Sequence, residues 1–324
     1  MEPAPSPPLT RTYPGGVRAV DTGLLRPEMA ASFLVTERGR AAFVEAGTAH
    51  STPGLLAALK EAGRSPDEVD WVIVTHVHLD HAGGAGRLMR QLPNATLVVH
   101  PRGTRHMIDP SRLVKGATAV YGERAFAEQF GEIVPVPEER VRIAGEGDRI
   151  ELAGRPLEFM DTPGHAKHHF CVWDERTRGW FTGDTFGLSY REFDTGTGPF
   201  LFPTTTPIDF DPEAMHESVN RLLSFAPECV YLTHYGRVDD PAALAPDLHR
   251  RIDAIAAIGE RHADAGGNRE ARIRSDMEHW LLEELAAHGV SLPEDEQRRL
   301  LAMDLDLNAQ GLDVWLSRRE KPPS

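Results

Sequence analysis

A short segment of the chain carries four side chains that commonly bind metal ions. It reads His76-Val-His78-Leu-Asp80-His81 and directly follows the apolar run Trp71–Thr75. A β-branched run of this kind predicts a strand buried on both faces, and open α/β sheets place their sites at the carboxyl ends of strands. Imidazole nitrogens together with a carboxylate suit zinc or another borderline divalent metal. The segment therefore predicts a metal site.

Three later strand ends or tight turns each present one further potential ligand. His165 follows Thr-Pro-Gly, Asp184 follows Phe-Thr-Gly, and His234 follows Leu-Thr. Each is a weak signal alone, because a single histidine after a strand is more often a structural residue. With the first segment they bring the total to five histidines and two aspartates. Such a set suffices for two metal ions with three protein ligands each, one shared carboxylate and a bridging solvent molecule.

The ordered set, HxHxDH followed by single His, Asp and His, resembles the metallo-β-lactamase superfamily in its glyoxalase II-like and lactonase-like branch. The resemblance covers residues 17–240 and implies an α/β fold, a four-layer αββα sandwich with two mixed sheets face to face and helices outside. It also implies how the ligands divide. The first metal would be held by His76, His78 and His165, the second by Asp80, His81 and His234, and Asp184 would bridge them.

Two positions depart from the pattern that this resemblance implies. Members often carry Asp-x-Gly after an early strand, but here Glu45 stands in the Asp position. The residue at that position usually braces the metal-binding loop, so Glu45 bears on loop geometry more than on metal binding. Lactonase-like members often place a tyrosine shortly after the bridging aspartate. Tyr190 lies six residues after Asp184, and its equivalence to that tyrosine is left open.

The predicted chemistry is hydrolysis, because coordination to divalent ions lowers the pKa of water toward about 7 and so generates hydroxide at neutral pH. We predict a binuclear hydrolase that uses a metal-bridging hydroxide on a small ester, lactone or thioester. Asp80 could orient the hydroxide and accept its proton. Candidate proton donors to the leaving group are His168, His169 and Tyr235. Because side chains alternate along a strand, at most one of His168 and His169 is expected to face the site.

Other chemistry fits the same ligands. Persulfide dioxygenase-type relatives are oxidoreductases that keep the motif but use one iron, held by two histidines and an aspartate. A phosphodiesterase is a further alternative because nuclease relatives share the motif, although a net charge of −14 disfavours a polyanionic substrate. The predicted cofactors are therefore two divalent ions, with zinc preferred and iron or manganese as alternatives.

The remaining histidines show no ligand spacing. His100 and His106 follow another strand end, where a structural role is predicted. Six more fall mostly on helical patterns and are predicted to lie on the surface: His50, His216, His249, His262, His279 and His288.

The surrounding sequence predicts the elements that must position these residues. A β-hairpin is predicted over 32–36 and 41–45 with Gly39 in its turn, and a helix over 51–62. Apolar residues beyond Pro241 repeat at three- and four-residue steps, which predicts amphipathic helices. Further strands are predicted at 96–100, 150–152, 157–160, 170–173, 179–181 and 229–232, with a helix at 212–225. The predicted domains are a disordered Pro-rich tail (1–16), a catalytic domain (17–240) and a C-terminal helical extension (241–324).

Composition and charge limit the class of partner and the compartment. Two cysteines in 324 residues exclude a disulfide framework and fit a reducing compartment. The acidic balance argues against nucleic acid or an anionic membrane, and no apolar run reaches the ~20 residues that a transmembrane helix needs. We expect a cytoplasmic protein with a small-molecule substrate and no nucleic-acid or membrane partner. A homodimer through the C-terminal helices is left open.

Overall fold

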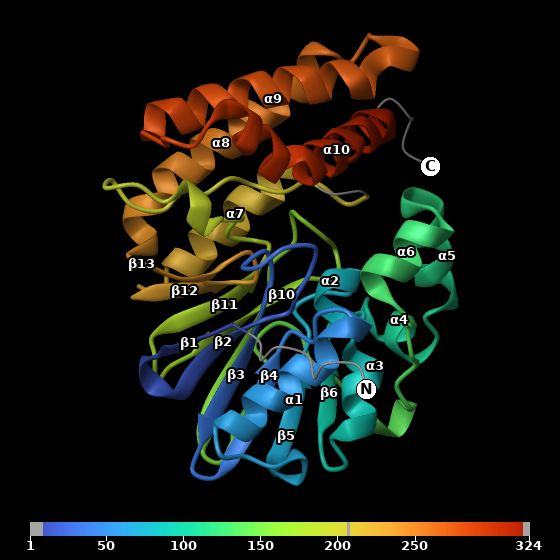
Figure 1. Ribbon diagram of the computed structural model, residues 1–324, viewed down its shortest axis with the longest axis vertical. Helices are drawn as coiled ribbons and strands as arrows, with labels where there is room; N and C mark the ends of the chain where they lie inside the picture. The colour runs from blue at the N-terminus through green and yellow to red at the C-terminus, as the bar shows by residue number, and fades with distance from the viewer. Residues whose placement is uncertain (1–8, 206–207, 320–324) are drawn as a thin grey trace. The chain divides into compact units, whose positions relative to one another are not determined.

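The polypeptide folds as two units in the computed structural model, which describes residues 9–205 and 208–319 (Figure 1). The first unit comprises the described residues up to Asp161, together with His168–Gly183 and Glu228–Asp239. The second comprises Thr162–Lys167, the described part of Asp184–Pro227 and the described residues from Asp240 onward. The predicted domain boundary after residue 240 stays a prediction.

The first sheet of the first unit has seven strands in the order β1-β2-β3-β4-β5-β6-β7. Neighbouring strands are antiparallel from β1 to β4 and parallel from β4 to β7. The strands are β1 (Thr10–Tyr13), β2 (Val17–Asp21), β3 (Ala31–Glu37), β4 (Arg40–Val44), β5 (Val69–Ile73), β6 (Thr96–Val99) and β7 (Val141–Ile143). The predicted hairpin is confirmed as β3 and β4, and Gly39 between them has a φ of 85°.

The second sheet of the first unit has six strands in the order β13-β12-β11-β10-β9-β8. Only β11 and β12 are parallel neighbours; the other pairs are antiparallel. The strands are β8 (Arg149–Leu152), β9 (Arg155–Asp161), β10 (Phe170–Asp174), β11 (Gly179–Gly183), β12 (Cys229–Leu232) and β13 (Gly236–Asp239). Every strand predicted from residue 150 onward is therefore present.

Two apolar layers hold the first unit together. One lies between the sheets and joins residues such as Phe33 and Ile73 of the first sheet to Phe181 of the second. The other joins the first sheet to the helices α1 (Thr52–Glu61), α2 (Leu79–Ala82) and α3 (Ala85–Gln91). Val72 belongs to the helix-side layer and its neighbour Ile73 to the layer between the sheets. This confirms that the run before His76 is buried on both faces.

Three helices of the first unit have no counterpart in the predicted elements. They are α4 (Thr104–Ile108), α5 (Ser111–Tyr121) and α6 (Glu123–Phe130). Phe126 and Phe130 of α6 form a small apolar cluster with Leu79, against which Tyr121 of α5 packs. Leu79 lies between the predicted ligands His78 and Asp80, so this cluster supports the predicted metal-binding segment from one side.

The prediction of a disordered tail over residues 1–16 is wrong from Thr10 onward. Thr10–Tyr13 form β1, which pairs antiparallel with β2. The connection contains Gly15, whose φ of 76° lies in the left-handed region that glycine adopts without steric cost. The proline-rich composition obscured a short hairpin with β-branched residues. Residues 1–8 of the predicted tail lie outside the described residues.

Four helices form most of the second unit: α7 (Pro212–Leu223), α8 (Pro241–Arg261), α9 (Arg269–His288) and α10 (Glu294–Arg319). The last three are drawn in orange to red in Figure 1 and pack against one another. Their apolar stripes are buried, as at Ile255, Leu281 and Leu305, which confirms the predicted C-terminal helices. Among the described residues, no helix combines the length and the apolar character needed to cross a bilayer.

Candidate metal centre

The predicted metal-binding segment begins just beyond β5. β5 ends at Ile73, although Val74 still donates a hydrogen bond to the carbonyl of Val98 at 3.1 Å. His78 is extended and immediately precedes α2, so Asp80 and His81 lie in the first turn of that helix. His76 and His81 are fully buried, whereas the side chain of Asp80 is 26% exposed. The segment thus offers buried imidazoles beside one solvent-accessible carboxylate.

Glu45 is the hydrogen-bond acceptor that links the two segments of the first unit that carry predicted ligands. It directly follows β4, and its buried carboxylate accepts bonds from both the backbone N–H and the hydroxyl of Thr75. The same carboxylate accepts from His81 Nδ1 at 3.1 Å and from Thr233 Oγ1 at 3.3 Å. The Thr75 hydroxyl in turn accepts from His76 Nδ1 at 3.0 Å. Glu45 therefore braces the residues around three predicted histidine ligands.

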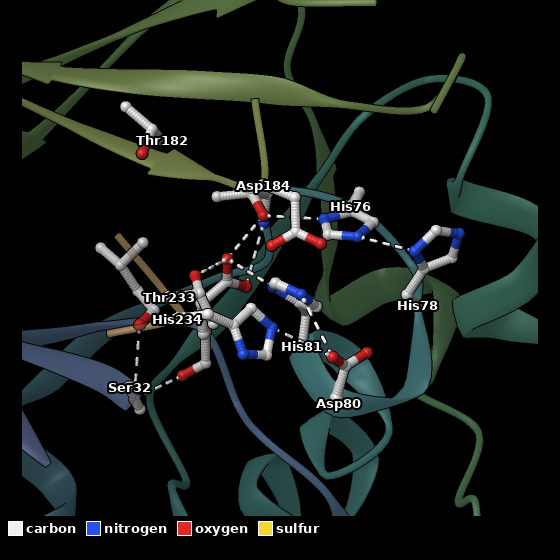
Figure 2. Close-up of polar contacts among 12 residues, drawn as sticks. Ser32, His76, His78, Asp80, His81, Thr182, Asp184, Thr233 and His234 are labelled. Atoms are coloured by element: carbon white, nitrogen blue, oxygen red, sulfur yellow. Dashed lines mark hydrogen bonds and ion pairs between the residues drawn. The ribbon is translucent and has the colours of Figure 1, made fainter. Parts of the chain in front are cut away.

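Two further contacts fix which ring nitrogen of His81 and His234 carries the proton. Carboxylate and carbonyl oxygens only accept, so Nδ1 of His81 donates to Glu45 and Nδ1 of His234 donates to the carbonyl of Met29 at 2.7 Å. When such a ring is neutral, its Nε2 then carries a lone pair. The two Nε2 atoms lie 3.5 Å and 3.3 Å from Oδ2 of Asp80 (Figure 2). Two lone pairs and a carboxylate oxygen repel one another unless a cation or an added proton lies among them.

His165 shows the same arrangement within the second unit. It is buried, and its Nδ1 lies 3.4 Å from the carbonyl oxygen of Thr204, to which it can only donate. Its Nε2 lies 3.4 Å from Oδ2 of Asp184. The ring is therefore held in the tautomer that presents a lone pair to a carboxylate.

Three of the predicted ligands, Asp80, His81 and His234, all lie in the first unit, and one potential ligand atom from each lies within 4.8 Å of the others. His76 and His78 also belong to the first unit, and His165 and Asp184 belong to the second. Imidazole and carboxylate donors in these numbers fit a divalent ion such as zinc. The residues present therefore fit the metals that the sequence predicts.

His168 and His169 both lie beside His76, contrary to the expectation that only one faces the site. Their ring centroids are 6.2 Å and 4.8 Å from that of His76. Both residues precede β10, which begins at Phe170, so the alternation of a strand does not apply to them. His168 is half-buried and stacks on His76, whereas His169 is buried.

Tyr235 occupies a different environment from the one expected of a proton donor. Its ring belongs to the apolar layer between the two sheets, and burial raises the pKa of its hydroxyl. Within residues 9–205 and 208–319 that hydroxyl is buried and has no hydrogen-bond partner. This placement does not support the predicted role. Tyr190 is also buried, and its hydroxyl donates to Asp304 of α10 at 3.0 Å.

The remaining histidines divide between structural contacts and the surface. His100 is buried, and its Nδ1 accepts a hydrogen bond from the backbone N–H of Arg102 at 3.1 Å. His216 and His249 are half-buried rather than on the surface, and their Nδ1 atoms lie 2.6 Å apart. Their helical spacing gave no sign of this contact, because the two residues lie on different helices. Nor does the sequence single out Met29 or Thr204, which act through backbone carbonyls.

The fold and the set of ligands define a metallo-β-lactamase-type protein. A family model described as the metallo-beta-lactamase superfamily matches residues 25–234. The chain therefore belongs to the metallo-β-lactamase superfamily, as the sequence predicts.

Several relatives share this fold. Metallo-beta-lactamase fold-containing protein ST1585 of Sulfurisphaera tokodaii is 25% identical over 268 residues, which cover 81% of this chain and 94% of its own. Its crystal structure has a TM-score of 0.61 at 21% identity and covers 92% of this chain and 98% of that one. The metallo-beta-lactamase family protein TTHA1429 from Thermus thermophilus has a TM-score of 0.59 at 19% identity and covers 94% of each chain. The predicted α/β fold class with appended C-terminal helices is confirmed.

Hydroxyacylglutathione hydrolases are also among the relatives. The enzyme of that name from Klebsiella pneumoniae is 28% identical over 182 residues, which cover 56% of each chain. The present chain thus spans about half the length of that relative, and the match supports a hydrolase fold with a metal site.

Proposed function

We propose that this protein is a binuclear metal-dependent hydrolase that acts on a small ester, lactone or thioester. One observation carries the proposal: imidazole Nε2 atoms converge on a carboxylate while each Nδ1 is tied to an acceptor. This occurs for His81 and His234 around Asp80, and again for His165 beside Asp184. Ligating histidines in metalloproteins are typically oriented in this way by a bond from the other ring nitrogen.

The proposed ligand assignment is the one that the family resemblance implies. His76, His78 and His165 would hold one ion, Asp80, His81 and His234 would hold the other, and Asp184 would bridge. When bound, two divalent ions supply a hydroxide nucleophile at neutral pH and polarise the substrate carbonyl. Asp80 is partly exposed, so its carboxylate can accept a proton from the attacking water.

His168 is the proposed proton donor to the leaving group. Of the three candidates it is the one that is half-buried beside His76, whereas His169 and Tyr235 are buried. A donor matters most for alkoxide leaving groups. A thiolate leaves more readily because the pKa of a thiol is only about 8.5. His168→Gln should therefore slow ester and lactone turnover more than thioester turnover.

The substrate class rests on the relatives named hydroxyacylglutathione hydrolases, since an acylglutathione is a thioester. The test is a panel of small thioesters, lactones and esters assayed with chelator-stripped protein before and after reconstitution with zinc, manganese or iron. We expect turnover to appear only with bound metal and to scale with occupancy up to two ions. Oxygen uptake with a persulfide substrate and one iron per chain, without hydrolysis, would establish the oxidoreductase alternative instead.

A further inference from the structure

The C-terminal helix α10 presents two buried polar side chains on one face, Asp304 and Asn308, four residues apart. Asp304 accepts the hydroxyl bond of Tyr190. Asn308 Oδ1 accepts from the Thr204 hydroxyl at 3.2 Å and from the backbone N–H of Thr205 at 2.7 Å. All five residues belong to the second unit. α10 therefore forms hydrogen bonds with two parts of the segment that follows Asp184, at Tyr190 and at Thr204–Thr205.

The contact between Asn308 and Thr205 bears directly on His165. The N–H of Thr205 and the carbonyl of Thr204 belong to the same peptide group, which is planar, and in the trans form they point in opposite directions. Asn308 binds the N–H side of this group, and His165 Nδ1 binds the carbonyl side at 3.4 Å. Because the group is planar, fixing the direction of the Thr205 N–H also fixes the direction of the Thr204 carbonyl. The Thr205 hydroxyl also donates to the backbone carbonyl of Asn308 at 2.9 Å, which further restrains the position of Thr205.

We propose that Asn308 is a positioning residue for the predicted metal ligand His165. By orienting the Thr204–Thr205 peptide, Asn308 keeps a carbonyl on Nδ1, so that His165 carries its proton there and presents the Nε2 lone pair. Which nitrogen of a histidine is available to a metal is set by the bond that the other nitrogen makes. The importance of this tautomer for catalysis rests on the proposed function, but the tautomer itself does not. The helix α10 thereby forms part of the support of His165.

The Asn308 side-chain amide is well suited to a test because its oxygen accepts hydrogen bonds, whereas its nitrogen donates none among the described residues. The Thr205 N–H can only donate, so the atom facing it must be the amide oxygen. The amide nitrogen is buried and makes no hydrogen bond to any part of the chain that the structure describes. Asn308→Leu therefore removes the acceptor, loses no bond on the nitrogen side and keeps a similar volume. Tyr190→Phe is the matched control, since it removes another buried bond to α10 that does not lead to His165.

The experiment measures the tautomer of His165 by long-range ¹H–¹⁵N correlation in metal-free protein with ¹⁵N-labelled histidine, at about pH 8, above the usual imidazole pKa of about 6.5. We expect the Nδ1–H tautomer in the native protein and in Tyr190→Phe, and a shift toward Nε2–H in Asn308→Leu. Asn308→Asp retains an acceptor oxygen and should retain the Nδ1–H tautomer, which keeps the test decisive if the leucine variant does not fold. An unchanged tautomer in Asn308→Leu, or its loss in Asn308→Asp, would overturn the proposal.

Metal titration then distinguishes the positioning role of Asn308 from the proposed binuclear function. In Asn308→Leu the affinity of the ion held by His165 should fall about 10- to 100-fold, as when other groups that orient ligating histidines are removed. The affinity of the ion held by Asp80, His81 and His234 should not change, and Tyr190→Phe should change neither. If the native protein bound no second ion while the tautomer still depended on Asn308, the proposed function would fail and the positioning role would stand.

Discussion

Replacing Glu45 by glutamine changes one oxygen of a buried carboxylate that receives four hydrogen bonds. Oε1 accepts three of them, from the hydroxyls of Thr75 and Thr233 and from His81 Nδ1, and Oε2 accepts the fourth from the Thr75 N–H. An amide offers a single acceptor oxygen. In its best orientation Glu45→Gln keeps the three bonds of Oε1 and turns its NH₂ group toward the Thr75 N–H, so at least one buried donor loses its acceptor.

The size of the effect follows from this count. One buried donor left without an acceptor costs about 1–3 kcal/mol, and the three remaining bonds weaken because their acceptor is no longer charged. We therefore expect the metal-free protein to lose about 2–4 kcal/mol of unfolding free energy. His81 also loses the carboxylate that raises its basicity, which should weaken the metal that it holds by about 10- to 100-fold.

The assay combines isothermal titration with zinc and urea unfolding of metal-free protein. Asp174→Asn is the matched control. Asp174 is likewise buried and pairs with Arg155, but it lies at the opposite end of β10 from His169. The control should lose stability and keep the native metal affinity. Native zinc affinity in Glu45→Gln, with stability lost as in the control, would show that Glu45 stabilises the fold without shaping the site.

Three further predictions address individual residues. Asp184→Ala should lose at least one metal and lower turnover about 100-fold or more while circular dichroism stays native; full metal content with normal turnover would show that Asp184 is not a ligand. Tyr235→Phe should leave turnover unchanged and raise the unfolding free energy by up to about 1 kcal/mol. The reason is that it removes a buried hydroxyl that has no hydrogen-bond partner among the described residues. A large fall in kcat would instead indicate that Tyr235 is the proton donor. Burial, and secondarily His216, lower the pKa of His249, so the unfolded chain binds the extra proton more readily. Stability should therefore fall as the pH drops below about 6.5, and His249→Gln should flatten this fall in urea unfolding at pH 5–8.

The fold was accessible from the sequence where hydrophobic patterning is strong. The run before His76 and the stripes of α8 to α10 are predicted correctly because each buries a large apolar surface that its own residues specify. β1 was missed because four residues beside a proline-rich stretch gain their strand character from pairing with β2. The helices α4 to α6 were missed because they are short, with five, eleven and eight residues, so each shows few repeats of a helical period.

The candidate site likewise has one part that the sequence predicts and one part that it does not. Its ligands can be predicted because metal-binding side chains occur at characteristic spacing directly after strands. The groups that orient them cannot, since Met29 and Thr204 act through backbone carbonyls and Asn308 lies 143 residues beyond His165. No local pattern specifies contacts of such separation; they depend on how distant elements pack.

The central claim is that two divalent ions bind, with His81, His234 and His165 ligating through Nε2. Anomalous diffraction at metal absorption edges, with elemental analysis of the same protein, tests this claim most directly. We expect two peaks per chain. One should lie about 2.0–2.1 Å from Nε2 of both His81 and His234, and the other at the same distance from Nε2 of His165. A single iron peak, ligation of His81, His234 or His165 through Nδ1, or no metal at these residues would contradict it.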